Sequence, residues 1–223
     1  MKTKYLSAVL LFVCVFAIGA HGAEIGVRDI VFFGDSTTAH MKLRGGVPEE
    51  NVWSGQANTV LFSGVNEVCP VYLPEKGVSV TLSDAVREKK PKILVITLGV
   101  SGGAGFVPEA KFKEIYRDML DSIRKNSPET KIFVQSILPL SEKSVLHYSR
   151  LTKDAVTEAN GWIRQVCREE NIPYINTHDL LTDSDGYLKK IYQYDEYMHL
   201  TRDAYSVVIE NILKQVNDSL TRK

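Results

Sequence analysis

The sequence is poor in cysteine and carries no net charge. Its 223 residues include three cysteines, and its 27 basic residues balance 27 acidic ones. Without an excess of positive charge or a basic stripe, nucleic acid is not an expected partner. Cys14 lies in the amino-terminal apolar run, so two cysteines remain for the rest of the chain, Cys69 and Cys167. A pair of cysteines alone does not establish a disulfide, and no histidine lies near either one in the sequence to indicate a nucleophile.

The sequence also lacks a long hydrophobic run. The main amino-terminal run, residues 6–20, is shorter than the ~20 residues that a transmembrane helix needs. Two lysines precede this run and small residues follow it, which is the pattern of a secretory signal peptide. We predict a signal peptide over residues 1–23, cleaved after Gly22 or Ala23; the alternative is an uncleaved anchor. The predicted location is therefore secreted, periplasmic or cell-surface, with no stable membrane insertion after removal of the leader.

Residues 24–223 contain no internal repeat, linker or low-complexity segment, which predicts a single domain. The hydrophobic fraction of 44% and the charged fraction of 24% are ordinary for a globular protein with one sizeable core. Strands are predicted at residues 30–34, 92–99, 131–137 and 173–176, and helices at residues 37–46, 84–90, 109–126, 151–170 and 201–219. This alternation of strands and helices predicts an α/β fold with a central parallel sheet.

Two stretches and one cap complete the predicted secondary structure. Residues 51–59 have no clean period and are interpreted as a loop near the mouth of a site. Residues 60–80 are interpreted as irregular, with a hairpin, because they alternate loosely and contain prolines and a glycine. Ser83 is the expected cap of the helix at residues 84–90. The glycine-rich run at residues 99–105 lacks the G-x-G-x-x-G spacing, which argues against a dinucleotide fingerprint.

The first predicted strand runs directly into Gly34, Asp35 and Ser36. In open α/β sheets, ligands bind at the carboxyl ends of the strands, so Ser36 lies where a nucleophile would be placed. The free N–H groups at the start of the next helix would stabilise a developing negative charge. The alternative interpretation is an ordinary turn followed by a helix cap, and the tripeptide alone does not decide between the two.

A second polar group precedes the last predicted helix and contains Asp195, Glu196 and His199. An acid three or four residues before a histidine, on a loop, can bring its carboxylate back to that imidazole and orient it. The other nitrogen of His199 would then take a proton from Ser36. The residues therefore follow the logic of a catalytic triad, in the order serine, acid, histidine.

These motifs together resemble the GDSL/SGNH hydrolase family. The resemblance rests on Gly34-Asp35-Ser36, on the strand that ends at Gly99 and on the acidic–x–x–His–Leu–Thr block that ends at Thr201. It covers nearly the whole chain after the leader. It implies a three-layer αβα sandwich similar to flavodoxin, and hydrolysis of esters or thioesters without a metal or another cofactor.

The resemblance also assigns the triad by position. It implies that Ser36 is the nucleophile and that His199 is the general base. The family acid lies three residues before the histidine, which is Glu196 in this sequence, where the family usually has Asp. We therefore prefer Glu196 as the acid, and Asp195 is the competing candidate.

The oxyanion hole departs from the family pattern. The family uses the N–H of the nucleophile, a glycine N–H and an asparagine side chain; Ser36 and Gly55 match the first two, but Ser101 stands where the asparagine is expected. A hydroxyl is shorter than an amide and offers one donor. Three outcomes stay open: Ser101 or the turn at Gly102–Gly103 substitutes, Asn58 supplies the amide, or the protein is slow or inactive. The loss of one donor costs about 10²–10³ in rate.

Four further residues are predicted to border the substrate: Asp35, Gly99, Trp53 and Tyr197. For the two aromatic residues, burial in the core is an equal alternative. The remaining histidines outside the leader, His40, His147 and His178, have no matching partner and are predicted to be structural. The acidic loop with Asp179, Asp183 and Asp185 lacks the later Glu of a calcium loop, so no metal site is expected.

The sequence as a whole predicts a secreted serine esterase that acts on a small-molecule or glycan ester. Small acyl esters are the expected substrates, with O-acetyl groups on a polysaccharide or cell-wall glycan as the class suggested by the resemblance and by export. The alternatives are a binding protein of the same fold with impaired catalysis, a lipase or thioesterase, and an acyltransferase.

Overall fold

The computed structural model describes residues 24–221. The predicted signal peptide, residues 1–23, lies outside the described residues. Within residues 24–221, no helix combines the length and the apolar character needed to cross a membrane.

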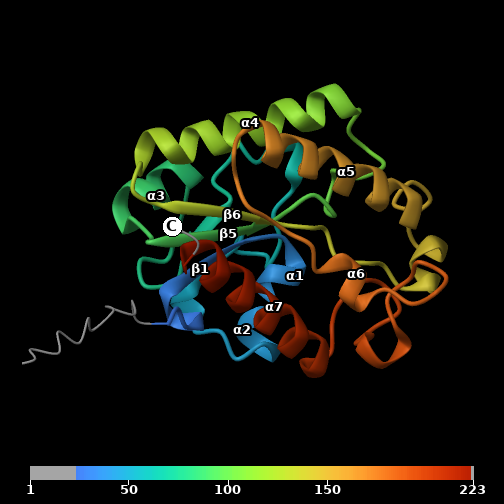
Figure 1. The fold of residues 1–223 in the computed structure, drawn as a ribbon. Coiled ribbons are helices and arrows are strands. Elements are labelled where there is room, and N and C mark those ends of the chain that lie inside the picture. Colours follow the sequence, from blue (N-terminus) through green and yellow to red (C-terminus); the bar gives the residue numbers. More distant parts are fainter. Residues whose placement is uncertain (1–23, 222–223) are drawn as a thin grey trace, which may run out of the picture.

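A five-stranded parallel sheet forms the centre of the molecule (Figure 1). Its strands, from one edge to the other, are β2 (Val52–Trp53), β1 (Ile30–Gly34), β5 (Ile93–Thr97), β6 (Lys131–Gln135) and β7 (Tyr174–Ile175). β1, the first strand of this sheet along the chain, thus lies between the sheet's second strand, β2, and its third strand, β5. This is the flavodoxin-like order of a doubly wound sheet. The predicted α/β class with a parallel sheet is confirmed.

Helices cover both faces of the sheet and complete three layers (Figure 1). One layer contains α3 (Leu82–Lys89), α4 (Glu109–Asn126) and α5 (Lys153–Glu169). The other contains α2 (Met41–Arg44), α6 (His178–Leu181) and α7 (Arg202–Thr221), and the short α1 (Ser36–Ala39) begins at the end of β1. Short 3-10 turns occupy Val27–Asp29, Glu49–Asn51, Phe62–Gly64, Glu142–Leu146 and Lys190–Tyr192.

Each face of the sheet has its own apolar core. Successive strand residues point to opposite faces. One core contains Phe33, Leu94, Ile96 and Val134, with side chains of the layer that includes α4. The other contains Ile30, Phe32, Val95 and Phe133, with side chains of α7. Because both faces are buried, the strands are continuous apolar runs, and this is why they were predictable from the sequence.

The structure differs from the sequence-based expectations at three elements. The single helix expected at residues 37–46 is two short helices, α1 and α2. Val52 and Trp53, expected in a loop, form the edge strand β2, which pairs with β1 over two residues and is too short to show a period. Helix α3 begins at Leu82, and the hydroxyl of Thr81 caps it by accepting the N–H of Asp84 at 3.1 Å, so the expected cap at Ser83 is wrong. The expected hairpin is present as β3 (Val71–Leu73) and β4 (Val78–Val80).

Both cysteines of the described chain are free thiols. Cys69 is exposed and Cys167 is buried on α5. Burial raises the pKa of the Cys167 thiol to about 12. At neutral pH Cys167 is therefore protonated and behaves as a small core residue.

Candidate active site

The fold brings Ser36 and His199 together although 163 positions separate them. Ser36 is the first residue of α1, directly after β1, and His199 lies in the loop that precedes α7. The Nε2 atom of His199 lies 3.2 Å from the Oγ atom of Ser36. The Nδ1 atom of His199 is hydrogen-bonded to the carboxylate of Asp195. Because a carboxylate only accepts, Nδ1 carries the hydrogen and Nε2 is left to accept the hydrogen of the Ser36 hydroxyl.

Asp195 is held by its own turn. Its Oδ1 atom accepts the N–H groups of Tyr197 at 2.9 Å and of His199 at 3.2 Å, and this leaves Oδ2 to face the imidazole. Burial raises the pKa of Asp195, but the hydrogen bonds from the Tyr197 N–H and from His199 outweigh it, so the pKa lies below its ordinary value. The carboxylate is therefore ionised at neutral pH and suited to orient the ring.

Glu196 has a different position. Its side chain is 58% exposed and forms an ion pair with Lys143, while its backbone carbonyl accepts the hydroxyl of Ser141. The structure thus brings Asp195 to His199, and our preference for Glu196 as the acid was wrong. The turn decides this, because it directs the carboxylate four residues before the histidine back to the ring.

Asp35 is a buried cap and does not line an open site. It is 1% exposed, and its Oδ1 atom accepts the Thr37 hydroxyl at 3.0 Å and the Thr37 N–H at 3.3 Å. Burial raises its pKa to about 6, against hydrogen bonds from Thr37 and from the N–H groups of Val100 and Ser101. The expectation that Asp35 contacts substrate is therefore corrected: it ties the loop after β5 to the turn that carries Ser36.

The loops that follow β2 and β5 lie on either side of the turn that carries Ser36. β1 pairs with β2 as far as Phe33 and Trp53, and with β5 as far as Gly34 and Thr97. β2 and β5 end two residues before Gly55 and Gly99, so the loops that contain these glycines leave the sheet on either side of β1. Neighbouring strands are separated by about 4.8 Å, so both loops begin within one strand spacing of the nucleophile turn.

A hydrogen bond joins these two loops. The hydroxyl of Thr59 donates to the Oγ atom of Ser101 at 3.3 Å. Asn58 is exposed, has a φ of 56°, and donates its N–H to the carbonyl of Gly55 at 2.8 Å, which closes the turn. The predicted oxyanion residues Ser36, Gly55, Asn58 and Ser101 thus belong to one cluster of turns at the carboxyl edge of the sheet. Which of their donors stabilises an oxyanion stays a prediction.

Backbone conformation and packing explain why residue 99 is a glycine. Its φ is +130°, and a Cβ atom at this position would lie 2.9 Å from the side chain of Ile137 and 3.2 Å from that of Phe112. Both neighbours belong to the buried core. The backbone conformation and this close packing explain the glycine, and a contact of Gly99 with substrate stays a prediction.

The two predicted aromatic residues differ in position. Trp53 is 3% exposed and belongs to the core, so its predicted role at the substrate is corrected. Tyr197 is half-buried in the loop that carries Asp195 and His199, and its ring lies 4.3 Å from that of His147. A role for Tyr197 at the substrate stays a prediction.

Sequence reasoning missed His40 and Arg44. The ring of His40 lies 4.5 Å from the ring of His199, with an angle of 60° between them. An Nη2 atom of Arg44 lies 2.6 Å from the Nδ1 atom of His40. Burial, together with the neighbouring His199 and the positive charge of Arg44, lowers the pKa of His40 to about 4. The available clue was spacing, because His40 follows Ser36 by four residues, which is one turn of a helix.

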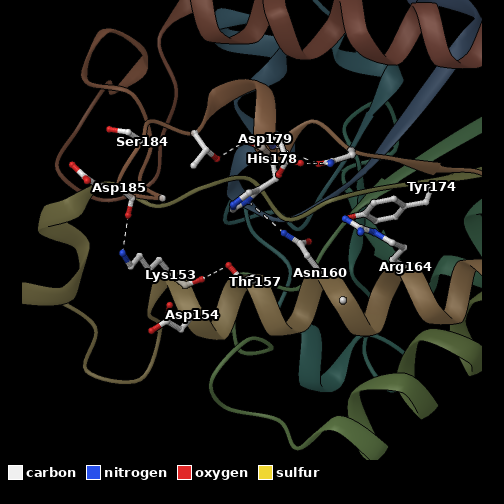
Figure 2. A pocket seen from close by; sticks show the side chains of 14 residues that line it. Lys153, Asp154, Thr157, Asn160, Arg164, Tyr174, His178, Asp179, Ser184 and Asp185 are labelled. Atoms are coloured by element: carbon white, nitrogen blue, oxygen red, sulfur yellow. Dashed lines mark hydrogen bonds between the residues drawn. The ribbon is translucent and has the colours of Figure 1, made fainter.

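A separate polar cavity of about 620 Å³ lies between α5 and α6, beside the end of β7 (Figure 2). It is lined by Lys153, Asp154, Thr157, Asn160, Gly161, Arg164, Tyr174, Asn176, His178, Asp179, Thr182, Ser184, Asp185 and Gly186, none of which has an aliphatic side chain. Asn160 and His178 form part of a rigid wall, since both hydrogen-bond to Ile137 after β6. The cavity thus lies at the same edge of the sheet as Ser36, beside β7, which is separated from β1 by β5 and β6.

Among residues 24–221, no group of three or more histidine, cysteine, aspartate or glutamate residues has the arrangement of a metal site. In the acidic loop, the Oδ1 atom of Asp183 accepts the N–H groups of Asp185 and Tyr187, both at 3.0 Å. These hydrogen bonds use the carboxylate to close a turn.

The sheet order, the serine at the end of β1 and the histidine before the last helix together define a class of α/β hydrolytic enzyme. A family model described as the GDSL-like Lipase/Acylhydrolase family matches residues 32–207. The chain belongs to this family, and it is a carboxylic ester hydrolase. A sequence comparison with curated proteins gave no match.

Solved structures share the fold at low sequence identity. A GDSL-like lipase from Bacteroides thetaiotaomicron is 17% identical, with a TM-score of 0.56, over 89% of this chain and 92% of that one. A carbohydrate esterase of family 3 from Talaromyces cellulolyticus is 11% identical, with a TM-score of 0.53, over 87% and 98%. An acetyl xylan esterase is 15% identical, with a TM-score of 0.52, over 84% and 99%.

Proposed function

We propose that the protein is a secreted serine esterase that uses Ser36, His199 and Asp195 as a catalytic triad. The observation that carries the proposal is the chain of hydrogen bonds from the Asp195 carboxylate through the His199 ring to the Ser36 hydroxyl. Export is proposed from the leader pattern at residues 1–23.

The proposed reaction has two steps. The Ser36 oxygen attacks the ester carbonyl while His199 Nε2 takes the hydroxyl proton, and the same proton then goes to the leaving alcohol oxygen. Water, deprotonated by His199, attacks the acyl-enzyme and releases the acid and the free Ser36 hydroxyl. In each step the ionised Asp195 stabilises the imidazolium, and the N–H of Ser36 donates to the negative charge on the carbonyl oxygen.

Small acyl groups, above all O-acetyl groups on a glycan, are the proposed substrates. Support comes from the cavity at the same edge of the sheet, whose lining offers amide, hydroxyl and charged groups that can hydrogen-bond to a polyhydroxylated chain. The names of two structural neighbours, a carbohydrate esterase and an acetyl xylan esterase, point to the same class of substrate.

The test compares the mature protein with Ser36→Ala. We expect turnover of p-nitrophenyl acetate and release of acetate from acetylated xylan, with both activities lost in the variant while its circular dichroism spectrum stays unchanged. Turnover by Ser36→Ala at the normal rate would refute the assignment. Preference for a long-chain p-nitrophenyl ester over the acetate would refute the substrate class and leave the triad standing.

A second candidate, a binding protein with impaired catalysis, is favoured by Ser101 in the place of the family asparagine. Labelling with a fluorophosphonate separates the two candidates, because the reaction needs an activated serine. Rapid labelling of the mature protein, absent in Ser36→Ala, supports the esterase. Failure to label supports the binding protein.

A further inference from the structure

Arg44 connects the two parts of the chain that carry the candidate triad. It is the last residue of α2, eight positions after Ser36. Its Nε–H donates to the backbone carbonyl of Leu200 at 3.0 Å, and its guanidinium carbon lies 3.9 Å from the centre of the Tyr194 ring. Leu200 and Tyr194 are the two ends of residues 194–200, here called the triad loop, which contains both Asp195 and His199.

The triad loop is closed on itself at the point where Arg44 contacts it. The N–H of Tyr194 donates to the carbonyl of His199 at 2.9 Å, and Gln193 forms a bridge with Leu200. Arg44 stacks on one end of this closed loop and hydrogen-bonds to the other. Its contacts therefore set the distance between the triad loop and the segment that begins at Ser36.

Burial and the guanidinium of Arg44 together determine the protonation state and the tautomer of His40. Arginine is always protonated and only donates, so the 2.6 Å contact makes His40 Nδ1 an acceptor and leaves the ring hydrogen on Nε2. The ionisable groups that face or flank this pair are His199 and Asp195 on the triad loop and Tyr205 of α7, which contacts Arg44. The result is a neutral imidazole packed 4.5 Å from the ring of His199.

We propose that Arg44 and His40 are positioning residues of the active site. Arg44 clamps the triad loop to the nucleophile segment and fixes the tautomer of His40, so that an uncharged, half-buried ring supports His199 while His199 takes on a proton. A cation at the position of the His40 ring would oppose the imidazolium that the reaction forms. The inference rests on the proposed triad function for its link to catalysis, but not for the state of His40.

Three variants test the clamp: Arg44→Gln, Arg44→Lys and, as a control on the same helix, Lys42→Gln. The ammonium group of Lys42 forms an ion pair with Glu49, which lies outside the triad loop. We expect Arg44→Gln to lower kcat with p-nitrophenyl acetate roughly 10–100-fold with little change in KM, because a small misplacement of a catalytic group costs this much. Arg44→Lys keeps the charge but cannot make the forked contacts while stacking, so the same loss is expected. Lys42→Gln should match the parent protein.

The pH profile and the imidazole spectrum separate positioning from general loss of structure. In the parent protein, the nitrogen-15 shifts of His40 should stay those of a neutral ring with hydrogen on Nε2 down to about pH 5, above its pKa of about 4. In Arg44→Gln, His40 should titrate at higher pH, and the activity should fall more steeply on the acid side.

Two results would overturn the clamp. One is an Arg44→Gln variant with parental kcat and pH profile, or full rescue by Arg44→Lys, which would show that charge alone matters. The other is a parent protein in which His40 carries its hydrogen on Nδ1 or titrates near the ordinary value. If instead the parent enzyme is inactive and Ser36 is unreactive, the proposed function fails, and the nitrogen-15 spectrum still decides the Arg44–His40 contact.

Discussion

The hydroxyl of Thr59 hydrogen-bonds to the hydroxyl oxygen of Ser101 at 3.3 Å and so joins the two loops that flank Ser36. Since Thr59 is the donor, the Ser101 oxygen is engaged as an acceptor, and Ser101 has one hydrogen left to donate. An asparagine side chain would reach further and present two donors. The contact therefore makes position 101 a sensitive place to test the oxyanion hole.

We expect Ser101→Asn to raise kcat for p-nitrophenyl acetate, by no more than the ~10²–10³ that a missing oxyanion donor costs. Thr59→Val serves as the control, because it removes the hydroxyl that bonds Ser101 without adding an amide. An unchanged or lower rate in Ser101→Asn would mean that Asn58 or a backbone N–H already completes the hole.

The two acids of the triad loop should differ sharply in their effect on the rate. Asp195→Asn removes the charge and disturbs the tautomer of His199, and the comparable change in a serine protease triad costs about 10⁴ in kcat. Glu196→Gln breaks an exposed ion pair with Lys143 and should change kcat less than twofold and stability by about 0–1 kcal/mol. Steady-state kinetics of the pair check this, and equal losses in both variants would contradict the geometry.

Burial of Asp35 should make stability depend on pH. Its pKa is raised from 3.8 to about 6, so the protonated carboxyl stabilises the folded protein at low pH, and this contribution is lost as the pH rises through about 6. The shift corresponds to at most about 3 kcal/mol in the free energy of unfolding. Asp35→Asn is neutral at every pH and lacks the effect. Urea unfolding at pH 4 and pH 7 should show the parent protein losing stability relative to the variant, and parallel curves would contradict the burial.

Gly161 and Gly105 form a matched pair for a test of stability. Gly161 lies in the middle of α5, and no atom lies within 4 Å of an added Cβ, so Gly161→Ala should stabilise the protein by about 0.5–1 kcal/mol. Gly105 has a φ of +74°, and an added Cβ would lie 1.9 Å from the carbonyl oxygen of Arg150. Gly105→Ala should therefore destabilise the protein by at least about 1–3 kcal/mol. Thermal unfolding checks both signs, and a lower melting temperature for Gly161→Ala would contradict the open space at that position.

From the sequence alone, the class of fold and the candidate nucleophile could be predicted. Strands such as residues 93–97 are buried on both faces, and that burial appears directly as a continuous apolar run. The helix at residues 109–126 was predicted with the bounds that α4 has, because its buried side chains recur with the helical period. Ser36 was identifiable because a glycine and a polar residue end the first strand at the edge where ligands bind.

How the candidate site is completed depends on contacts that form when the chain folds. Asp195 and Glu196 are both close enough to His199 in the sequence to orient it, and the choice depends on a turn in which one oxygen of Asp195 binds backbone N–H groups. The contact of Arg44 with Leu200 spans 156 positions, and no local period reports such a distance. Hydrophobic patterns record which face of an element is buried, whereas contacts between polar groups far apart in the chain depend on how the elements pack, and that packing exists only in the folded protein.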